Sequence, residues 1–157
     1  MISTQLISSQ SLRYFPHFAG LNEEFLRQIA LIGDQVKFEA GDELLVEGAP
    51  AIHFCLLISG AVDIVYTLGD NRTVVADTLV SGDTFGWSAF MEPHKLTASC
   101  VGSKNGEYIR IEGEGLRRIC DENPECGYRV ALELSKLLRD RLSALRVQIA
   151  AAQSALS

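Results

Sequence analysis

The chain has 157 residues, 47% of them hydrophobic and 22% charged, and its formal net charge is −6 at pH 7. This length fits one domain with its own hydrophobic core, and the ordinary composition argues against a disordered chain. The negative charge disfavours contact with nucleic-acid phosphates, so we expect no binding to nucleic acid. The sequence shows no basic leader and no apolar run of ~18 residues, so we expect a cytoplasmic protein that does not bind a membrane.

The first expected elements are an arm and a helix. Residues 1–14 are expected to form an N-terminal arm on a domain that covers residues 15–123. A helix is predicted after Asn22, because this side chain can cap a helix and apolar residues follow it at three- and four-residue steps. These residues are Phe25, Leu26, Ile29 and Ala30. The helix is expected to end by Gly33.

Between residues 35 and 111 short apolar runs alternate with glycines, which indicates short antiparallel strands. The glycines expected at the turns are Gly41, Gly48, Gly60, Gly69, Gly82 and Gly102. Val62, Ile64 and Tyr66 share one face of a strand, which we expect to line the interior of a roll. The predicted fold class is mainly β with flanking helices (α+β): an antiparallel β-roll of the jelly-roll or double-stranded β-helix type, with an N-terminal helix and a long C-terminal helix.

The C-terminal part is predicted to be helical. A short helix from Gly115 to Cys120 precedes a helix of ~25 to 28 residues from about residue 125 to residue 152, roughly 40 Å long. We assign residues 124–157 to this long helix. Four apolar residues form a stripe along it at four- and three-residue steps: Leu138, Leu142, Leu145 and Ile149. Such a stripe is typical of a coiled-coil seam and predicts a homodimer; the alternative is that the stripe packs back on the roll.

Side chains with metal or catalytic chemistry are scattered along the sequence. The four cysteines include no CxxC pair and are expected to be reduced thiols, with Cys55 and Cys100 buried in strands. The three histidines have no carboxylate at a metal-ligand spacing, and no nucleophile–base pattern is visible. The sequence therefore predicts neither a metal site nor an enzyme.

Three motifs in order carry a resemblance to a known family. They are FEAGDELLVEG at residues 38–48, LISGAV at residues 57–62 and GDTFG at residues 82–86. With the order of helices and strands, they resemble the cyclic nucleotide-binding domain family, which includes the bacterial catabolite activator and the regulatory subunit of protein kinase A. The resemblance covers about residues 15–150.

The resemblance implies a phosphate-binding cassette at residues 85–99. Its candidate ligand-binding residues are Phe85, Gly86, Trp87, Ser88, Ala89, Lys95, Thr97, Ala98 and Ser99. Two positions depart from the family pattern. Trp87 stands where a Glu holds the ribose, and Leu96 stands where an Arg pairs with the phosphate, while Lys95 can offer only a point charge.

The expected function is a regulatory module that senses a small ligand and has no DNA-binding domain, since the chain ends soon after the long helix. The ligand is a cyclic nucleotide bound through altered contacts, or another small anionic or aromatic molecule. The alternative is a ligand-independent dimerisation or interaction scaffold, with Trp87 filling the pocket and a further protein as possible partner. A related branch of the family binds haem, for which His53 or His94 would be the axial ligand, but no cofactor is certain.

Overall fold

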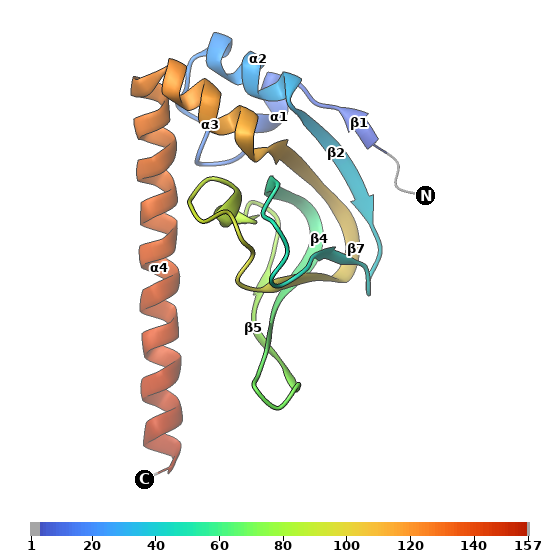
Figure 1. Cartoon of the computed structure of the whole chain (residues 1–157), viewed down its shortest axis with the longest axis vertical. Helices are drawn as coiled ribbons and strands as arrows, with labels where there is room; N and C mark the ends of the chain where they lie inside the picture. Colours follow the sequence, from blue (N-terminus) through green and yellow to red (C-terminus); the bar gives the residue numbers. More distant parts are fainter. Residues whose placement is uncertain (1–3, 157) are drawn as a thin grey trace.

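A computed structural model describes residues 4–156 of the chain (Figure 1). The strands are β1 (Thr4–Leu6), β2 (Gly33–Phe38), β3 (Glu43–Leu45), β4 (His53–Thr67), β5 (Thr73–Leu79), β6 (Thr84–Phe85) and β7 (Ser99–Glu112). The helices are α1 (Ser9–Arg13), α2 (Glu23–Leu31), α3 (Gly113–Glu122) and α4 (Pro124–Leu156), with a single 3-10 turn, η1 (Trp87–Ala89). The strand-rich middle and its flanking helices confirm the predicted fold class.

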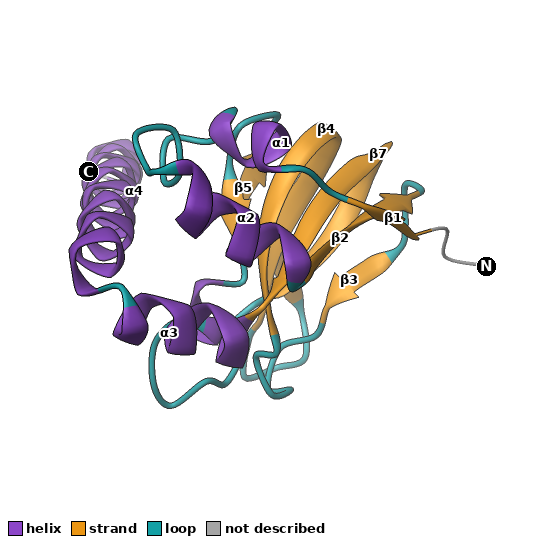
Figure 2. Ribbon diagram, turned by 90° about the horizontal axis from the view of Figure 1, so that it is seen from above, coloured by secondary structure: helices purple, strands orange, loops and turns teal. Residues whose placement is uncertain are grey.

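The strands form one curled antiparallel sheet in the order β1-β2-β7-β4-β5, to which β3 adds on β7 and β6 adds on β4. The long strands β4 and β7 pair along most of their length and form the centre of the sheet. Figure 2 shows α1, α2 and α3 lying over one end of the curved strands, with α4 standing beside them. This arrangement is the antiparallel β-roll that the glycine spacing predicted.

Two glycines expected at turns lie inside the long strands instead. Gly60 is a residue of β4 with a φ of 82°, at a point where the pairing with β7 shifts register. Gly102 is a residue of β7, and a Cβ added there would lie 2.8 Å from the Glu39 carbonyl oxygen. The prediction of turns at these two positions was wrong, because a glycine allows close backbone approach within a bent strand as well as reversal of the chain.

The core has two parts on opposite faces of the sheet. One part lies inside the roll and consists of buried aromatic and aliphatic side chains: Val36, Phe38, Leu57, Val62, Ile64, Leu79, Phe85 and Tyr108. On the other face, Phe54, Leu56, Ile109 and Ile111 pack with apolar residues of all four helices. Alternation along β7 explains the division, since neighbouring residues such as Tyr108 and Ile109 point to opposite faces.

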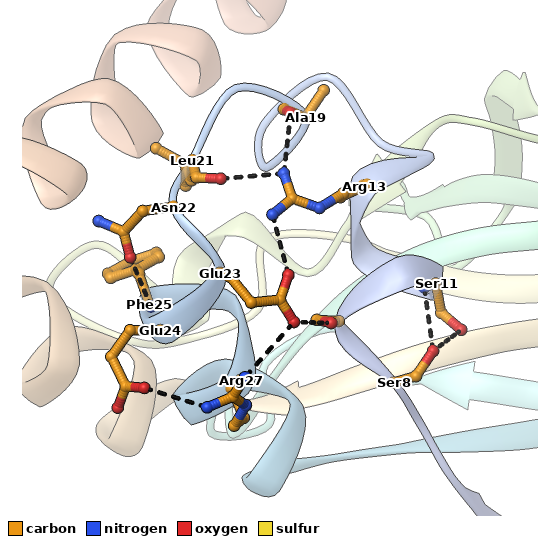
Figure 3. A network of polar contacts seen from close by, with 11 residues as sticks. Ser8, Ser11, Arg13, Ala19, Leu21, Asn22, Glu23, Glu24, Phe25 and Arg27 are labelled. Atoms are coloured by element: carbon orange, nitrogen blue, oxygen red, sulfur yellow. Dashed lines mark hydrogen bonds and ion pairs between the residues drawn. The ribbon is translucent and has the colours of Figure 1, made fainter.

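The predicted start of the first long helix is confirmed. The Asn22 side-chain oxygen accepts a hydrogen bond from the Phe25 amide at 2.8 Å, and α2 ends at Leu31. The expected N-terminal arm is tied to this helix. Glu23 accepts a hydrogen bond from the Ser9 hydroxyl at 2.5 Å. It also pairs with Arg13 at 3.0 Å, and Figure 3 shows Arg13 and Glu23 facing each other. Residues 1–3 of the arm lie outside the described residues.

The long C-terminal helix exceeds its predicted length. It has 33 residues, which corresponds to about 50 Å. Its first half packs on the core through Cys126, Val130 and Leu134, whereas every residue from Leu142 to Leu156 is exposed. The sequence beyond residue 152 contains good helix formers and no glycine or proline, so nothing ends the helix where the apolar pattern fades. Ser157 lies outside the described residues.

Candidate functional site

The predicted cassette begins inside the roll. Phe85 is 1% exposed and belongs to β6, which pairs with β4. Gly86 follows in the left-handed region with a φ of 73°, and a Cβ there would lie 2.6 Å from the His53 carbonyl oxygen. The chain therefore needs glycine here to pass close to β4 and to turn into η1.

Trp87 is held in a fixed position between the roll and the long helix. Its indole N–H donates a hydrogen bond to Thr84 Oγ1 at 3.0 Å. The guanidinium of Arg141, on α4, lies 5.5 Å from the centre of the indole ring, a cation–π distance. Arg141 also forms ion pairs with Asp77 and, at 3.9 Å, with Asp83. Trp87 thus links the roll to α4, two parts of the chain that are far apart in the sequence.

The amides of η1 are already partly used. Ala89 donates its backbone N–H to the Gly86 carbonyl at 3.1 Å, and Phe90 donates to the Trp87 carbonyl at 2.9 Å. Ala89 is fully buried, and its own carbonyl accepts from Arg117. Unpaired amides at the start of a helical turn can bind an anion, and in η1 the amides of Trp87 and Ser88 remain for this purpose.

In the second half of the cassette, at residues 95–99, some side chains are buried and others are exposed. Leu96 is 7% exposed and packs in the core, with its amide and carbonyl bonded to the segment at residues 48–49. Lys95 is exposed and does not line the cavity described next. Ser99 also points elsewhere, since its hydroxyl accepts from the Glu47 amide at 2.9 Å.

A cavity of about 60 Å³ lies between the two halves of the cassette. It is lined by Leu45, Ile64, Tyr66, Phe85, Gly86, Trp87, Ser88, Leu96, Thr97, Ala98 and Cys100. The structure therefore brings together six of the nine predicted ligand-binding residues and leaves out Ala89, Lys95 and Ser99. Pockets for drug-sized ligands usually measure ~300 Å³ or more, so this one is small.

The cavity residues outside the cassette come from three other strands. The alternation that placed Ile64 and Tyr66 toward the interior of the roll located two of them, although Tyr66 remains 40% exposed. Leu45 and Cys100 were missed as site residues. Cys100 was predicted to be buried, and burial raises the pKa of its thiol to about 12. It is a packing residue because a thiol of such high pKa stays protonated.

No charged side chain lines the cavity. The lining residues with hydroxyl groups are Ser88, Thr97 and Tyr66. A cyclic phosphate carries a full negative charge, and its transfer into an apolar site without a counter-charge costs several kcal/mol. With Trp87 and Leu96 at the positions that the resemblance matches to the ribose Glu and the phosphate Arg, the cavity is small and its described lining residues carry no charge.

The histidines do not converge on a metal or cofactor site. His94 donates from Nδ1 to the Ser88 carbonyl at 2.9 Å, and His53 is half-buried at the start of β4. Burial lowers the pKa of His53, and the nearby Arg110 adds to this effect. Within residues 4–156, no cluster of three or more histidine, cysteine or carboxylate side chains has the geometry to hold a metal ion.

Over the same described residues, none of the helices combines the length and the apolar character that a membrane crossing requires.

Comparison with known proteins agrees with the β-roll fold. The sequence model described as "Cyclic nucleotide-binding domain" matches residues 35–123. One similar solved structure is that of a protein of Geobacter metallireducens GS-15, which is assigned as a cyclic nucleotide-binding protein. Its sequence is 30% identical to this chain, and the match covers 87% of this chain and 98% of that one, with a TM-score of 0.77. A cyclic nucleotide-binding domain from Methylobacillus flagellatus KT has a TM-score of 0.82 at 17% identity, covering 94% and 87%.

A match of a different kind involves glutaminase 1 of Bradyrhizobium diazoefficiens, which is 28% identical over 127 residues. The aligned part is 81% of this chain and only 20% of that protein, so the chain spans about a fifth of the length of this curated relative. The family model, the 30% identical structure and the β-roll all lead to one assignment. The chain belongs to the cyclic nucleotide-binding domain family, whose domains are regulatory and ligand-sensing.

Proposed function

We propose that this chain is a non-catalytic, cytoplasmic regulatory module whose roll senses a small ligand other than a cyclic nucleotide and passes the signal through α4. The neutral cavity at Trp87 carries this proposal, because it retains the family's location but lacks a partner for a phosphate. The ligand expected there is smaller than a nucleotide and uncharged. The four buried free thiols fit a reducing compartment.

The second candidate is a scaffold that works without a ligand. The hydrogen bond of Trp87 to Thr84 and its contact with Arg141 favour it, because they hold the indole where a ribose would otherwise lie. In this case Trp87 acts as a core residue and α4 is permanently fixed to the roll. The two candidates share the domain division proposed from the sequence, with an arm at residues 1–14, the roll at residues 15–123 and the long helix from residue 124.

We further propose that α4 pairs with α4 of a second copy. Leu138 packs partly on the core of its own chain, whereas Leu142, Leu145 and Ile149 are 49%, 43% and 59% exposed. The helix continues far enough for Leu156, which is 88% exposed, to extend the same four- and three-residue spacing by way of Ala152. A continuous apolar stripe on a helix that protrudes from its domain suits a partner helix.

A titration with cyclic AMP tests the absence of a nucleotide site. We expect about 1 mM cyclic AMP or cyclic GMP to leave the melting temperature unchanged, because no charged group lines the cavity. A site with a Kd of about 10 μM would instead stabilise the fold by ~2.7 kcal/mol, which raises the melting temperature by roughly 5–10 °C at this chain length. A shift of that size in the unchanged chain would refute the proposal.

The matched variant restores the family's two ligand-holding groups. The double substitution Trp87→Glu and Leu96→Arg introduces a carboxylate for the ribose and a guanidinium for the phosphate and removes the bulk of the indole. We expect cyclic AMP to raise the melting temperature of this variant, once circular dichroism has shown that it folds. If cyclic AMP does not raise the melting temperature of the folded variant, these two positions do not explain the absence of cyclic AMP binding.

A further inference from the structure

A larger cleft lies between α4 and the body of the domain, and it is lined by other residues than the cavity at Trp87. Its volume is about 500 Å³, within the range of small-molecule pockets. Three parts of the chain line it: the segment after α1, which supplies His17; the roll, which supplies Asp77 and Asp83; and α4, which supplies Lys136, Leu137 and Arg141. Figure 1 shows α4 running alongside the roll.

Some of the buried polar atoms on the residues that line this cleft lack hydrogen-bond partners. Within the described residues, three buried side-chain nitrogen atoms have no hydrogen-bond partner, and they are His17 Nδ1, His17 Nε2 and Arg141 Nε. Both residues line the cleft, and His17 is only 3% exposed. An unsatisfied buried polar atom typically costs ~1–3 kcal/mol, so native structures rarely leave one without a function. All three atoms belong to residues that line this one cleft.

The charges around the cleft select an uncharged ligand. Arg141 is paired with Asp77 and Asp83, and Lys136 is paired with Glu133 at 3.0 Å. A ligand anion would face the carboxylates and a ligand cation would face the basic groups, so either would have to displace an existing ion pair. A neutral ligand can leave these pairs intact.

The unpartnered atoms define what such a ligand must offer. Burial lowers the pKa of His17, and the Glu133 carboxylate opposes this effect only in part, so the imidazole is neutral at physiological pH. A neutral imidazole offers one donor and one acceptor, and Arg141 Nε offers a further donor. A ligand carbonyl and an N–H group would satisfy them, while Leu137 provides apolar contact for a ring.

We propose that this cleft is a second small-molecule site, which takes an uncharged heteroaromatic compound with an amide or nucleobase-like edge. A ligand there would touch both the roll and α4 and would thereby fix the helix against the domain. This inference goes beyond the function proposed above and does not depend on the cavity at Trp87.

The test uses nicotinamide and adenine as neutral probes and nicotinate as a charged match of nicotinamide. We expect about 20 mM nicotinamide or adenine to raise the melting temperature of the full chain, and nicotinate to bind at least about tenfold more weakly. The variant His17→Leu should lose this response, whereas Ser88→Ala, which alters the other cavity, should keep it. The proposal is overturned if neither neutral probe binds or if His17→Leu binds as well as the unchanged chain.

A second variant covers the case in which His17→Leu does not fold. Arg141→Lys keeps the positive charge between Asp77 and Asp83 but removes the Nε–H donor. We expect it to weaken probe binding about five- to tenfold, the usual effect of one lost hydrogen bond. An unchanged affinity in this variant would contradict the assigned role of Arg141. Because Ser88→Ala separates the two sites, failure here leaves the proposed function at Trp87 to be judged by its own titration.

Discussion

A chain with Leu142→Glu and Leu145→Glu is expected to sediment as a monomer at concentrations where the unchanged chain is a dimer. Both side chains lie on the exposed stripe of α4, so the substitutions should leave the fold of each chain intact. In a paired helix, however, each carboxylate would be buried without a counter-charge, and two copies bring four such charges together. We expect the dimer dissociation constant to rise by about a thousandfold or more, which corresponds to ~4 kcal/mol.

The matched control places the same charges on the opposite side of the same helix. Val147 is 68% exposed and Ala151 is exposed, and at 100° per residue both lie away from the stripe. Val147→Glu with Ala151→Glu adds two carboxylates and should leave the dimer intact. Equal dissociation in both double variants would attribute the effect to charge alone, and a dimer that survives Leu142→Glu with Leu145→Glu would exclude the stripe as the interface. Analytical ultracentrifugation over a concentration series distinguishes these results.

The parts of the fold predicted from the sequence are those that depend on local spacing. The cap at Asn22, the alternation that turns Ile64 inward and the glycine-rich texture of the roll each follow from residues a few positions apart. The departures at Trp87 and Leu96 from the pattern that the resemblance implies could also be seen, because the motif around them is contiguous. These local features were sufficient to predict the β-roll, whereas the altered cassette stays a prediction.

The features that were missed depend on long-range contacts. Nothing near residue 141 indicates that this arginine covers an indole 54 positions earlier and pairs with Asp77. The sequence predicted no metal site at His17 and indicated no other role for it, because its environment of Phe18, Phe54 and α4 exists only in the folded chain. Gly60 and Gly102 were placed at turns for a similar reason, since the bend of one long strand around another is not encoded in a single local pattern.

Gly86→Ala is expected to destabilise the domain far more than Gly82→Ala, although both glycines flank β6 and both have a positive φ. At Gly82, with a φ of 96°, an added Cβ would meet no atom within 4 Å, so the substitution costs only the strain of a left-handed alanine, ~1–2 kcal/mol. At Gly86 the Cβ would also lie 2.6 Å from the His53 carbonyl oxygen. This oxygen belongs to the backbone of β4 and cannot rotate away as a side chain would.

The free energy of unfolding in urea should therefore fall by ~3–5 kcal/mol for Gly86→Ala and by no more than ~2 kcal/mol for Gly82→Ala. Trp87 supplies a second measurement, because relief of the clash must move η1 away from β4 and change the surroundings of the only tryptophan. Its emission in the folded state should shift in Gly86→Ala and stay constant in Gly82→Ala. Equal losses of stability would show that each glycine is needed only because its φ is positive, and that the cassette does not depend on close contact with β4.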